Sequence, residues 1–359
     1  MQNKRIAIKI GSNVLTKKDG SLDYTRMSAL VDQIAELHNR GVEIILISSG
    51  AVAAGRSKVL AEKLDTVSAR QLFSAIGQVR LIHRYYMLFR DHGITCGQVL
   101  TTKESLSTRG HYLNQRNCMS VMIEHGVIPI VNENDTISVT ELMFTDNDEL
   151  SGLLAAMMDA EKLIILSNID GIFNGNPSDP ESSVIREVLP GKRDLSAYIQ
   201  AGKSTFGRGG MQTKTNIASK VADEGIEVII ANGKKDNILI DLMDKQEETV
   251  CTRFIASPEP VSSVKKWIAH SEGFAKGEIH INARATKALL EDDEATSLLM
   301  VGVTDVKGKF EKDDIVKIIG NNGEQIGLGK VQYSSTEARK LIGMKGEKPI
   351  IHCDYMYIL

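Results

Sequence analysis

Two lysines, far apart in the chain, stand in settings that suit a phosphate group. Lys9 ends a short apolar run and is followed closely by Gly11 and Ser12, while Lys214 comes just after the glycine-rich stretch 207–210. A lysine beside glycine and a small hydroxyl residue can hold a phosphate, because glycine lets the backbone approach the anion closely. A glycine-rich loop that enters a helix presents backbone N–H groups and the positive end of the helix dipole. Each piece alone also fits a flanking lysine or a surface loop.

Small and acidic residues follow other apolar runs. The stretch 48–55 consists mostly of Ser, Gly and Ala, which leave room for a ligand but equally suit close packing of a helix on a strand. The stretches 132–135 and 146–149 consist entirely of Asn, Asp and Glu. Such side chains can hold lysines in place, bind magnesium or receive a substrate ammonium, and an Asx residue at a helix start is also an ordinary cap.

Other catalytic classes find no support in the residue spacing. The sequence contains no CxxC pair, and the four cysteines are predicted to be buried free thiols. The segment Gly202-Lys203-Ser204 lacks the upstream glycine and the preceding strand of a Walker A loop. Taken together, two lysines, two small-residue loops and an acidic cluster predict phosphoryl transfer, which depends on positioning and cationic stabilisation.

The elements that must position these residues alternate along the chain. Nearly continuous apolar runs, typical of strands buried on both faces of a parallel sheet, alternate with amphipathic helical patterns. The expected strands are 6–10, 44–47, 127–131, 163–166 and 228–231, and the expected helices are 27–40, 68–90, 113–125, 148–158 and 211–223. This order predicts an α/β fold with a mostly parallel sheet sandwiched by helices.

The pattern changes near residue 256. We expect a first domain over 1–256, a turn-rich linker over 257–274 and a small β-rich, barrel-like domain over 275–359. The second domain is predicted to have strands at 278–281, 298–303, 315–319 and 350–351, a tight turn at Asn322-Gly323 and a short helix at 337–342.

The amino-acid composition argues against nucleic acid and membranes as binding partners. The 359 residues carry a net charge of −3 and are 42% hydrophobic, so the chain can fill a sizeable core and has no overall attraction for nucleic acid or anionic membrane. Only 5% of the residues are aromatic, too few for a base-stacking platform. The apolar run at the N-terminus is too short for a signal peptide and none has the length of a membrane span, so a cytoplasmic location is expected.

Five motifs occur in the order seen in the amino acid kinase superfamily. They are Lys9-Ile10-Gly11-Ser12, Ser48-Ser49-Gly50-Ala51, Asn132-Glu133-Asn134-Asp135, Asp146-Asn147-Asp148 and Gly209-Gly210-Met211-Gln212-Thr213-Lys214. Over roughly residues 4–256 the chain resembles that superfamily, and within it the branch that opens proline biosynthesis. The resemblance implies transfer of the ATP γ-phosphoryl group to the side-chain carboxylate of L-glutamate, with Mg²⁺.

The resemblance also assigns roles to residues. It implies that Lys9 and Lys214 stabilise the transition state and that Asp148 orients them. It places L-glutamate at Ser49, Asp135 and Asn147. The nucleotide would contact Ser167 and Asn168, where relatives more usually have Thr-Asp, together with Lys9 and the loop residues Arg208, Gly209, Gly210, Met211, Gln212, Thr213 and Lys214. Homo-oligomerisation and feedback inhibition by proline are implied in the same way.

Other readings stay open beside this one. The acceptor could be aspartate, N-acetylglutamate, carbamate or UMP, all of which the superfamily phosphorylates. The tail, through 302–304 and 306–310, resembles the PUA domain, which raises RNA binding as an alternative. Residues 276–359 carry twelve Lys and Arg against thirteen Asp and Glu, so the tail has no basic footprint and RNA binding is not expected.

Overall fold

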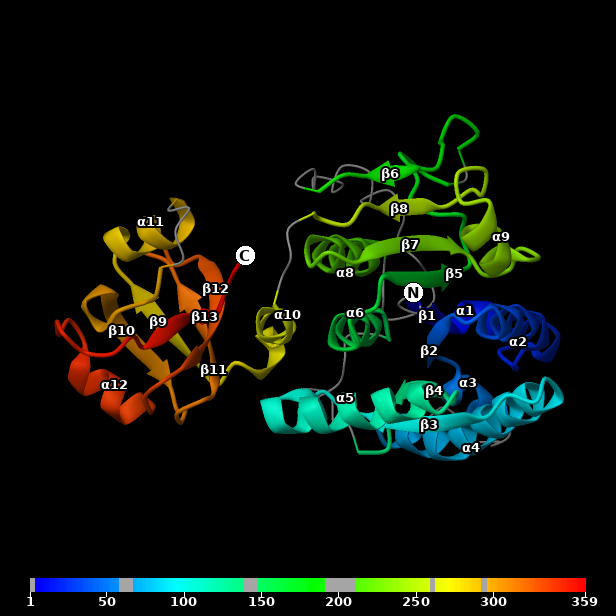
Figure 1. Cartoon of the computed structure of the whole chain (residues 1–359), viewed down its shortest axis with the longest axis horizontal. Helices are drawn as coiled ribbons and strands as arrows, with labels where there is room; N and C mark the ends of the chain where they lie inside the picture. The colour runs from blue at the N-terminus through cyan, green and yellow to red at the C-terminus, as the bar shows by residue number, and fades with distance from the viewer. Residues whose placement is uncertain are drawn as a thin grey trace. The chain divides into compact units, whose positions relative to one another are not determined.

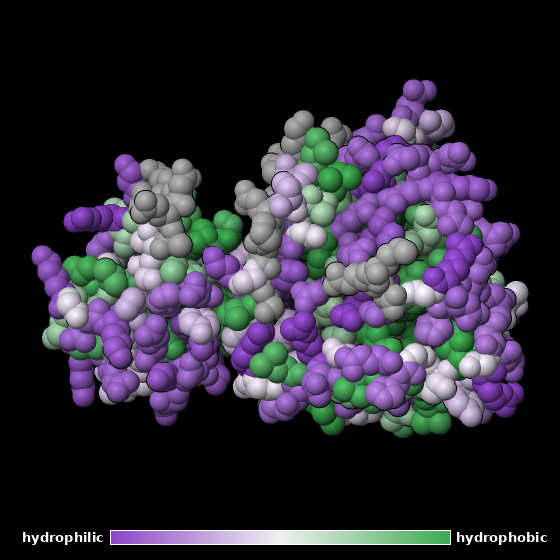
Figure 2. Space-filling model, in the orientation of Figure 1, coloured by the Kyte–Doolittle hydropathy of each residue, from purple (hydrophilic) through white to green (hydrophobic). Residues whose placement is uncertain are grey.

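The computed structural model describes residues 4–57, 67–137, 147–177, 179–190, 211–258, 262–291 and 296–359. It divides into two compact units, each described separately below. Unit 1 comprises Met1–Leu106 and Tyr112–Pro260, and unit 2 comprises Ser107–His111 and Val261–Leu359. On the face drawn in Figure 2, hydrophilic residues predominate on the surface of each unit, and the hydrophobic ones are scattered between them.

Unit 1 is built on a sheet of eight strands, in the order β3-β4-β2-β1-β5-β7-β8-β6. The strands are β1 (Arg5–Ile10), β2 (Glu43–Ser48), β3 (Cys96–Thr101), β4 (Ile128–Glu133), β5 (Lys162–Ser167), β6 (Glu187–Val188), β7 (Glu227–Asn232) and β8 (Thr252–Phe254). All neighbours pair in parallel except β7 and β8. The predicted α/β class with a mostly parallel sheet is confirmed.

Helices lie on both faces of this sheet (Figure 1). They are α1 (Ser12–Leu15), α2 (Tyr24–Asn39), α3 (Ala51–Arg56), α4 (Val67–Asp91), η1 (Glu104–Leu106), α5 (Arg109–Glu124), α6 (Asn147–Met157), α8 (Met211–Asp223) and α9 (Ile238–Asp244). Helix α2 ends as predicted, because Gly41, just beyond its C-cap, adopts a φ of 87° that a side chain would disfavour.

The side chains of β1 alternate between the two faces of the sheet. Ile6, Ile8 and Ile10 belong to one buried cluster with residues of α2, α4 and α9. Successive side chains of a strand point to opposite faces, so Lys9 points to the other face of the sheet. There α6 contacts both β1 and α8. A lysine inside an apolar strand is thus directed at two helices that carry polar residues.

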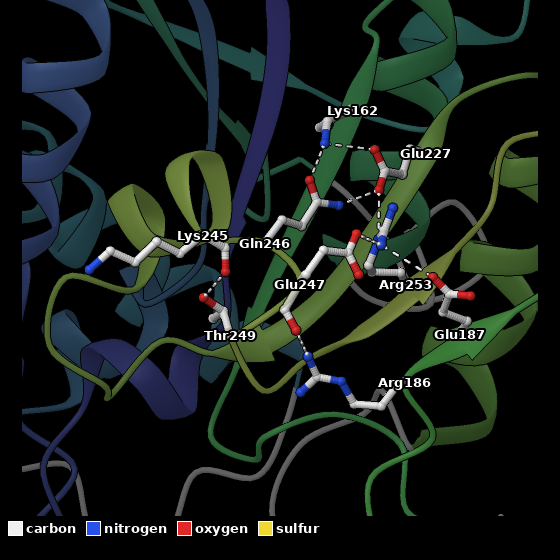
Figure 3. A network of polar contacts seen from close by, with 9 residues as sticks. All are labelled: Lys162, Arg186, Glu187, Glu227, Lys245, Gln246, Glu247, Thr249 and Arg253. Atoms are coloured by element: carbon white, nitrogen blue, oxygen red, sulfur yellow. Dashed lines mark hydrogen bonds and ion pairs between the residues drawn. The ribbon is translucent and has the colours of Figure 1, made fainter.

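A polar network joins the amino ends of β5 and β7 to β8, at the edge of the sheet opposite the ends where β1 and β5 finish (Figure 3). Glu227 accepts from Arg253 Nε at 3.1 Å and pairs with Lys162 Nζ at 2.7 Å. Burial alone raises the pKa of the Glu227 carboxyl, but the bonds from Lys162, Gln246 and Arg253 outweigh it and lower the pKa. The network ties the antiparallel strand β8 to the parallel sheet.

Unit 2 holds a separate five-stranded sheet, in the order β10-β9-β11-β12-β13. Its elements are α10 (Ser263–Ala269), η3 (Glu272–Phe274), β9 (Gly277–Ile281), α11 (Ala283–Glu291), η4 (Met300–Gly302), β10 (Val303–Gly308), β11 (Ile315–Ile319), β12 (Gln325–Val331), α12 (Ser335–Leu341) and β13 (Ile351–Ile358). The predicted tight turn joins β11 to the antiparallel β12, and Gly323 has the positive φ of 85° that such a turn requires.

Two predictions were wrong in these units. The stretch 298–303 is not one strand: Leu298 makes an isolated bridge to Ile351, the 3₁₀ helix η4 follows, and only Val303 belongs to a strand, as the first residue of β10. The cysteines are free, as expected, but only Cys251 is buried. Cys96 lies on the half-exposed edge strand β3, and Cys118 is exposed on α5, so their positions follow from element geometry rather than from the apolar character of the thiol.

Candidate functional site

Lys9, Asp148 and Lys214 meet at the carboxyl end of the parallel sheet. Lys9 comes from β1, Asp148 from the first turn of α6 and Lys214 from the first turn of α8. Lys9 Nζ binds Asp148 Oδ1, and Lys214 Nζ lies 2.8 Å from Asp148 Oδ2. One carboxylate therefore holds two ammonium groups that are about 200 residues apart in the chain.

The Asp148 side chain is completely inaccessible to solvent. Burial by itself raises the pKa of this carboxyl, but the charges and hydrogen bonds of Lys9 and Lys214 outweigh that effect and lower the pKa to about 2. The carboxylate therefore stays ionised at neutral pH. Two ammonium groups and one carboxylate leave one net positive charge, which suits an anionic ligand.

A chain of amides follows at the ends of β2 and β4. The Asn147 amide nitrogen donates to Ser49 Oγ at 2.8 Å and to Asn132 Oδ1 at 3.0 Å. Asn132 in turn donates to Gln78 on α4 at 2.9 Å. Between β2 and α3, Gly50 has a φ of 105°, a conformation that favours glycine and turns the chain sharply after Ser49.

Asp135 lies just beyond β4 and is almost fully buried. Its Oδ1 accepts from Arg70 Nη2, and its Oδ2 accepts from Ser74 Oγ at 3.3 Å. Arg70 also lies 3.5 Å from Glu133 Oε2. Helix α4 thereby holds the acidic loop through Arg70 and Ser74, one turn before Gln78, which contacts the amide chain.

The residues predicted to contact a nucleotide are only partly described. Ser167 ends β5 and is buried, whereas Asn168, the next residue, is exposed. Met211, Gln212 and Thr213 form the first turn of α8, directly before Lys214. Arg208, Gly209, Gly210 and Asp146 lie outside the described residues.

Sequence reasoning missed the contribution of α4. Arg70, Ser74 and Gln78 are spaced by four residues in a helix predicted only as an amphipathic pattern. That spacing places them on one side of the helix, and Ser74 and Gln78 are buried there. A polar row at i, i+4 and i+8 on a buried helix face is a signal that could have found them.

Comparison with known proteins defines the class of the chain. The profile of the amino acid kinase family matches residues 4–232, and the profile of the PUA domain matches residues 277–352. The chain belongs to the amino acid kinase family and carries a C-terminal PUA domain.

Curated relatives narrow the comparison. The chain is 70% identical to a glutamate 5-kinase from Bacteroides thetaiotaomicron, over 99% of this chain and 98% of that protein. It is 47% identical to a glutamate 5-kinase from Chlorobaculum tepidum, again over 99% of this chain and 98% of the relative. Among solved structures, carbamate kinase from Giardia lamblia bound to AMP-PNP has a TM-score of 0.51 at 16% identity, covering 71% of this chain and 99% of that one. This last likeness concerns the fold.

Proposed function

We propose that this chain transfers the γ-phosphoryl group of ATP to the side-chain carboxylate of L-glutamate, forming L-glutamyl 5-phosphate in the first step of proline biosynthesis. The near full-length identity to glutamate 5-kinases supports the reaction. The single structural observation that carries it is the sharing of the Asp148 carboxylate by Lys9 and Lys214 at the carboxyl edge of the sheet. Ligands of open α/β sheets bind at that edge.

The reaction needs no protein base. A glutamate side chain is ionised at neutral pH, because its ordinary pKa is about 4.3. One of its oxygens forms the new bond to the γ-phosphorus, and the bond from that phosphorus to the bridging oxygen of ADP breaks. Negative charge spreads over the transferring group, and Lys9 and Lys214 stabilise it. Asp148 keeps the two ammonium groups in place without entering the reaction.

The acceptor side has groups for both charges of an amino acid. Asn147 uses its nitrogen for the hydrogen bonds that it donates to Ser49 and Asn132, so its carbonyl oxygen can accept a hydrogen bond from a substrate ammonium. Asp135 supplies a carboxylate for the same ammonium. The Ser49 oxygen accepts from Asn147, which leaves its hydroxyl proton to donate to a substrate carboxylate.

The nucleotide enters as magnesium ATP. We assign its phosphates to Lys9 and Lys214, and we assign its remaining contacts to Ser167, Asn168 and the loop residues 208–213. The start of α8 favours an anion, because the first N–H groups of a helix lack partners within the helix. Magnesium neutralises phosphate charge when it is bound with the nucleotide.

An acceptor screen tests the proposal. The purified chain is incubated with magnesium ATP, hydroxylamine and one acceptor at a time: L-glutamate, aspartate, N-acetylglutamate or carbamate. Phosphorylation of UMP is measured separately, through the ADP that is released. We expect hydroxamate from L-glutamate and little from the others. N-acetylglutamate, carbamate and UMP lack the free ammonium that the amide and carboxylate groups fit, and the identity to glutamate 5-kinases favours glutamate over aspartate. Hydroxamate from aspartate but not from glutamate would overturn the proposal.

Further parts of the proposal concern the molecule as a whole. We assign residues 1–256 to the kinase domain, 257–274 to a linker and 275–359 to the PUA-like domain. We expect a homo-oligomer in the cytoplasm, with proline as a feedback inhibitor. In the part of the chain that the structure describes, no helix combines the length and apolarity needed to cross a bilayer.

A further inference from the structure

Gln78 ends a chain of amides that begins at the proposed acceptor site, with Gln78 and Asn132 buried and Asn147 half-buried. It lies on α4 and is 9% exposed. Its Oε1 accepts from Asn132 Nδ2 at 2.9 Å, and Asn132 Oδ1 accepts from Asn147 Nδ2 at 3.0 Å. Asn147 then donates to Ser49. None of the roles assigned above includes Gln78.

One backbone group reveals which atom of each amide is the oxygen and which is the nitrogen. The N–H of Glu133 points at the side chain of Asn132 and lies 2.9 Å from it. Because a backbone N–H can only donate, the Asn132 atom that faces it is the oxygen. The Asn132 nitrogen must then face Gln78, and the atom of Gln78 that receives it must be Oε1. The Asn147 atom that faces Asn132 Oδ1 must be its nitrogen.

This directionality prepares the acceptor site. If Asn147 turned its amide over, its oxygen would face Asn132 Oδ1, and two acceptors would meet in a buried place. The same turn would remove the hydrogen bond to Ser49. The observed orientation turns the Asn147 oxygen away from Asn132, where it can accept from an ammonium, and leaves the Ser49 proton available for a carboxylate.

We propose that Gln78 is a positioning residue for the acceptor amino acid: by accepting from Asn132, it holds Asn132 and Asn147 in the one orientation that binds the substrate ammonium and carboxylate. The inference rests on the proposed function. Gln78 acts through Asn132, so its removal changes glutamate binding and leaves nucleotide binding as it is.

The test replaces Gln78 by methionine, which has similar length but no acceptor oxygen. We expect KM for L-glutamate to rise on the order of tenfold, because a buried amide donor then lacks an acceptor, while KM for ATP stays within about twofold. Gln78→Glu keeps an acceptor oxygen at the same reach and should restore KM for glutamate to within about threefold of the wild-type value. If Gln78→Met does not fold, Gln78→Asn, which is too short to reach Asn132, takes its place.

Gln33 provides the matched control. It is a buried glutamine on α2 of the same unit, where its side chain bonds to Ala29 O and to Leu239 N, both at 2.8 Å. Gln33→Met should lower the unfolding temperature without changing KM for glutamate. The inference would be overturned if Gln78→Met raised KM for glutamate and KM for ATP equally. It would also be overturned if KM for glutamate were the same in Gln78→Met and Gln33→Met. Wild-type hydroxamate formation from glutamate is measured first, so that failure of the proposed reaction is recognised separately.

Discussion

At the scale of single residues, the site depends on oppositely charged groups that are held together inside the protein. Lys9 and Asp148 are almost completely buried, and Lys214 is only 13% exposed at its side chain. Removing one member of a buried ion pair leaves an uncompensated charge, which is more damaging than the loss of a surface pair. We therefore expect substitutions of these residues to change stability as well as the proposed catalysis, so the two effects need separate measurements.

Lys9→Ala and Lys214→Ala should each reduce kcat by about a hundredfold or more, because each removes a charge that stabilises the transferring phosphoryl group. Steady-state rates with magnesium ATP and glutamate measure the effect, and circular dichroism checks that the variants are folded. Lys18→Ala removes an exposed lysine of the same unit and should leave kcat unchanged. Full turnover by either site variant would disprove its catalytic role.

The acid stability of the protein should depend on Asp148. The pKa of its carboxyl, about 2, lies below the ordinary 3.8, so its ionised form stabilises the fold above about pH 4, and this contribution disappears as the pH falls through about 2. Asp148→Asn lacks this contribution. Urea unfolding should show a stability gap between wild type and variant that is wide at neutral pH and narrows on acidification. A gap that stays constant between about pH 6 and pH 3 would contradict the role of the carboxylate.

At the scale of elements, α4 links two parts of the site. Its polar row contacts the end of β4 and the loop after it, and its Gly77 packs against α3, which is separated from Ser49 only by Gly50. A Cβ atom at Gly77 would lie 1.7 Å from the carbonyl oxygen of Ala51, and one at Gly55 would lie 1.9 Å from that of Phe73. The two helices thus pack backbone against backbone, so the position of Ser49 depends on α4.

Gly77→Ala should force α3 and α4 apart and cost about 3 kcal/mol or more of the free energy of unfolding. It should also raise KM for glutamate, because Ser49 and Gly50 precede α3 directly. Urea unfolding and steady-state kinetics measure the two effects. Gly110→Ala on α5 is the control, since a Cβ atom there meets nothing within 4 Å. A variant at Gly77 as stable as the one at Gly110 would show that the helices can separate without penalty.

At the scale of the whole molecule, the PUA domain raises the question of nucleic acid. Charges in unit 2 pair with each other: Lys276 lies 2.9 Å from Asp314, and Lys330 lies 2.8 Å from Asp313. Phosphate contacts need lysines and arginines that are available to the backbone of RNA. The nearly even charge of residues 276–359 therefore favours a structural or regulatory module.

The full-length chain should show no binding to a structured RNA hairpin at about 10 μM protein and physiological salt, because a sequence-independent affinity requires a net positive surface. Fluorescence anisotropy with a labelled hairpin measures this. A control protein with a basic RNA-binding domain confirms that the hairpin is competent. Tight binding that weakens steeply with salt would make RNA recognition a function of the tail.

Helices and strands whose hydrophobic residues recur with a clear period were predicted well from the sequence. The helix expected at 211–223 is α8, and the strand expected at 315–319 is β11, with the same bounds. The edge strand β3 escaped prediction because its residues are only partly buried and include Gly97 and Gln98, so it has neither a continuous apolar run nor a clean alternation. The strands β6 and β8 are only two and three residues long, too short to carry a pattern.

Local sequence alone determined the order of the elements and the residue types at the ends of the strands, because hydrophobic periodicity and turn chemistry are local properties. It brought Lys9, Asp148 and Lys214 forward as candidates but did not determine that both lysines share one carboxylate. That depends on β1 directing Lys9 to the face where α6 and α8 begin. The amide chain from Gln78 to Ser49 was decided only by tertiary structure, since hydrogen bonds between residues up to 98 positions apart require the packed sheet and helices to bring donors and acceptors together.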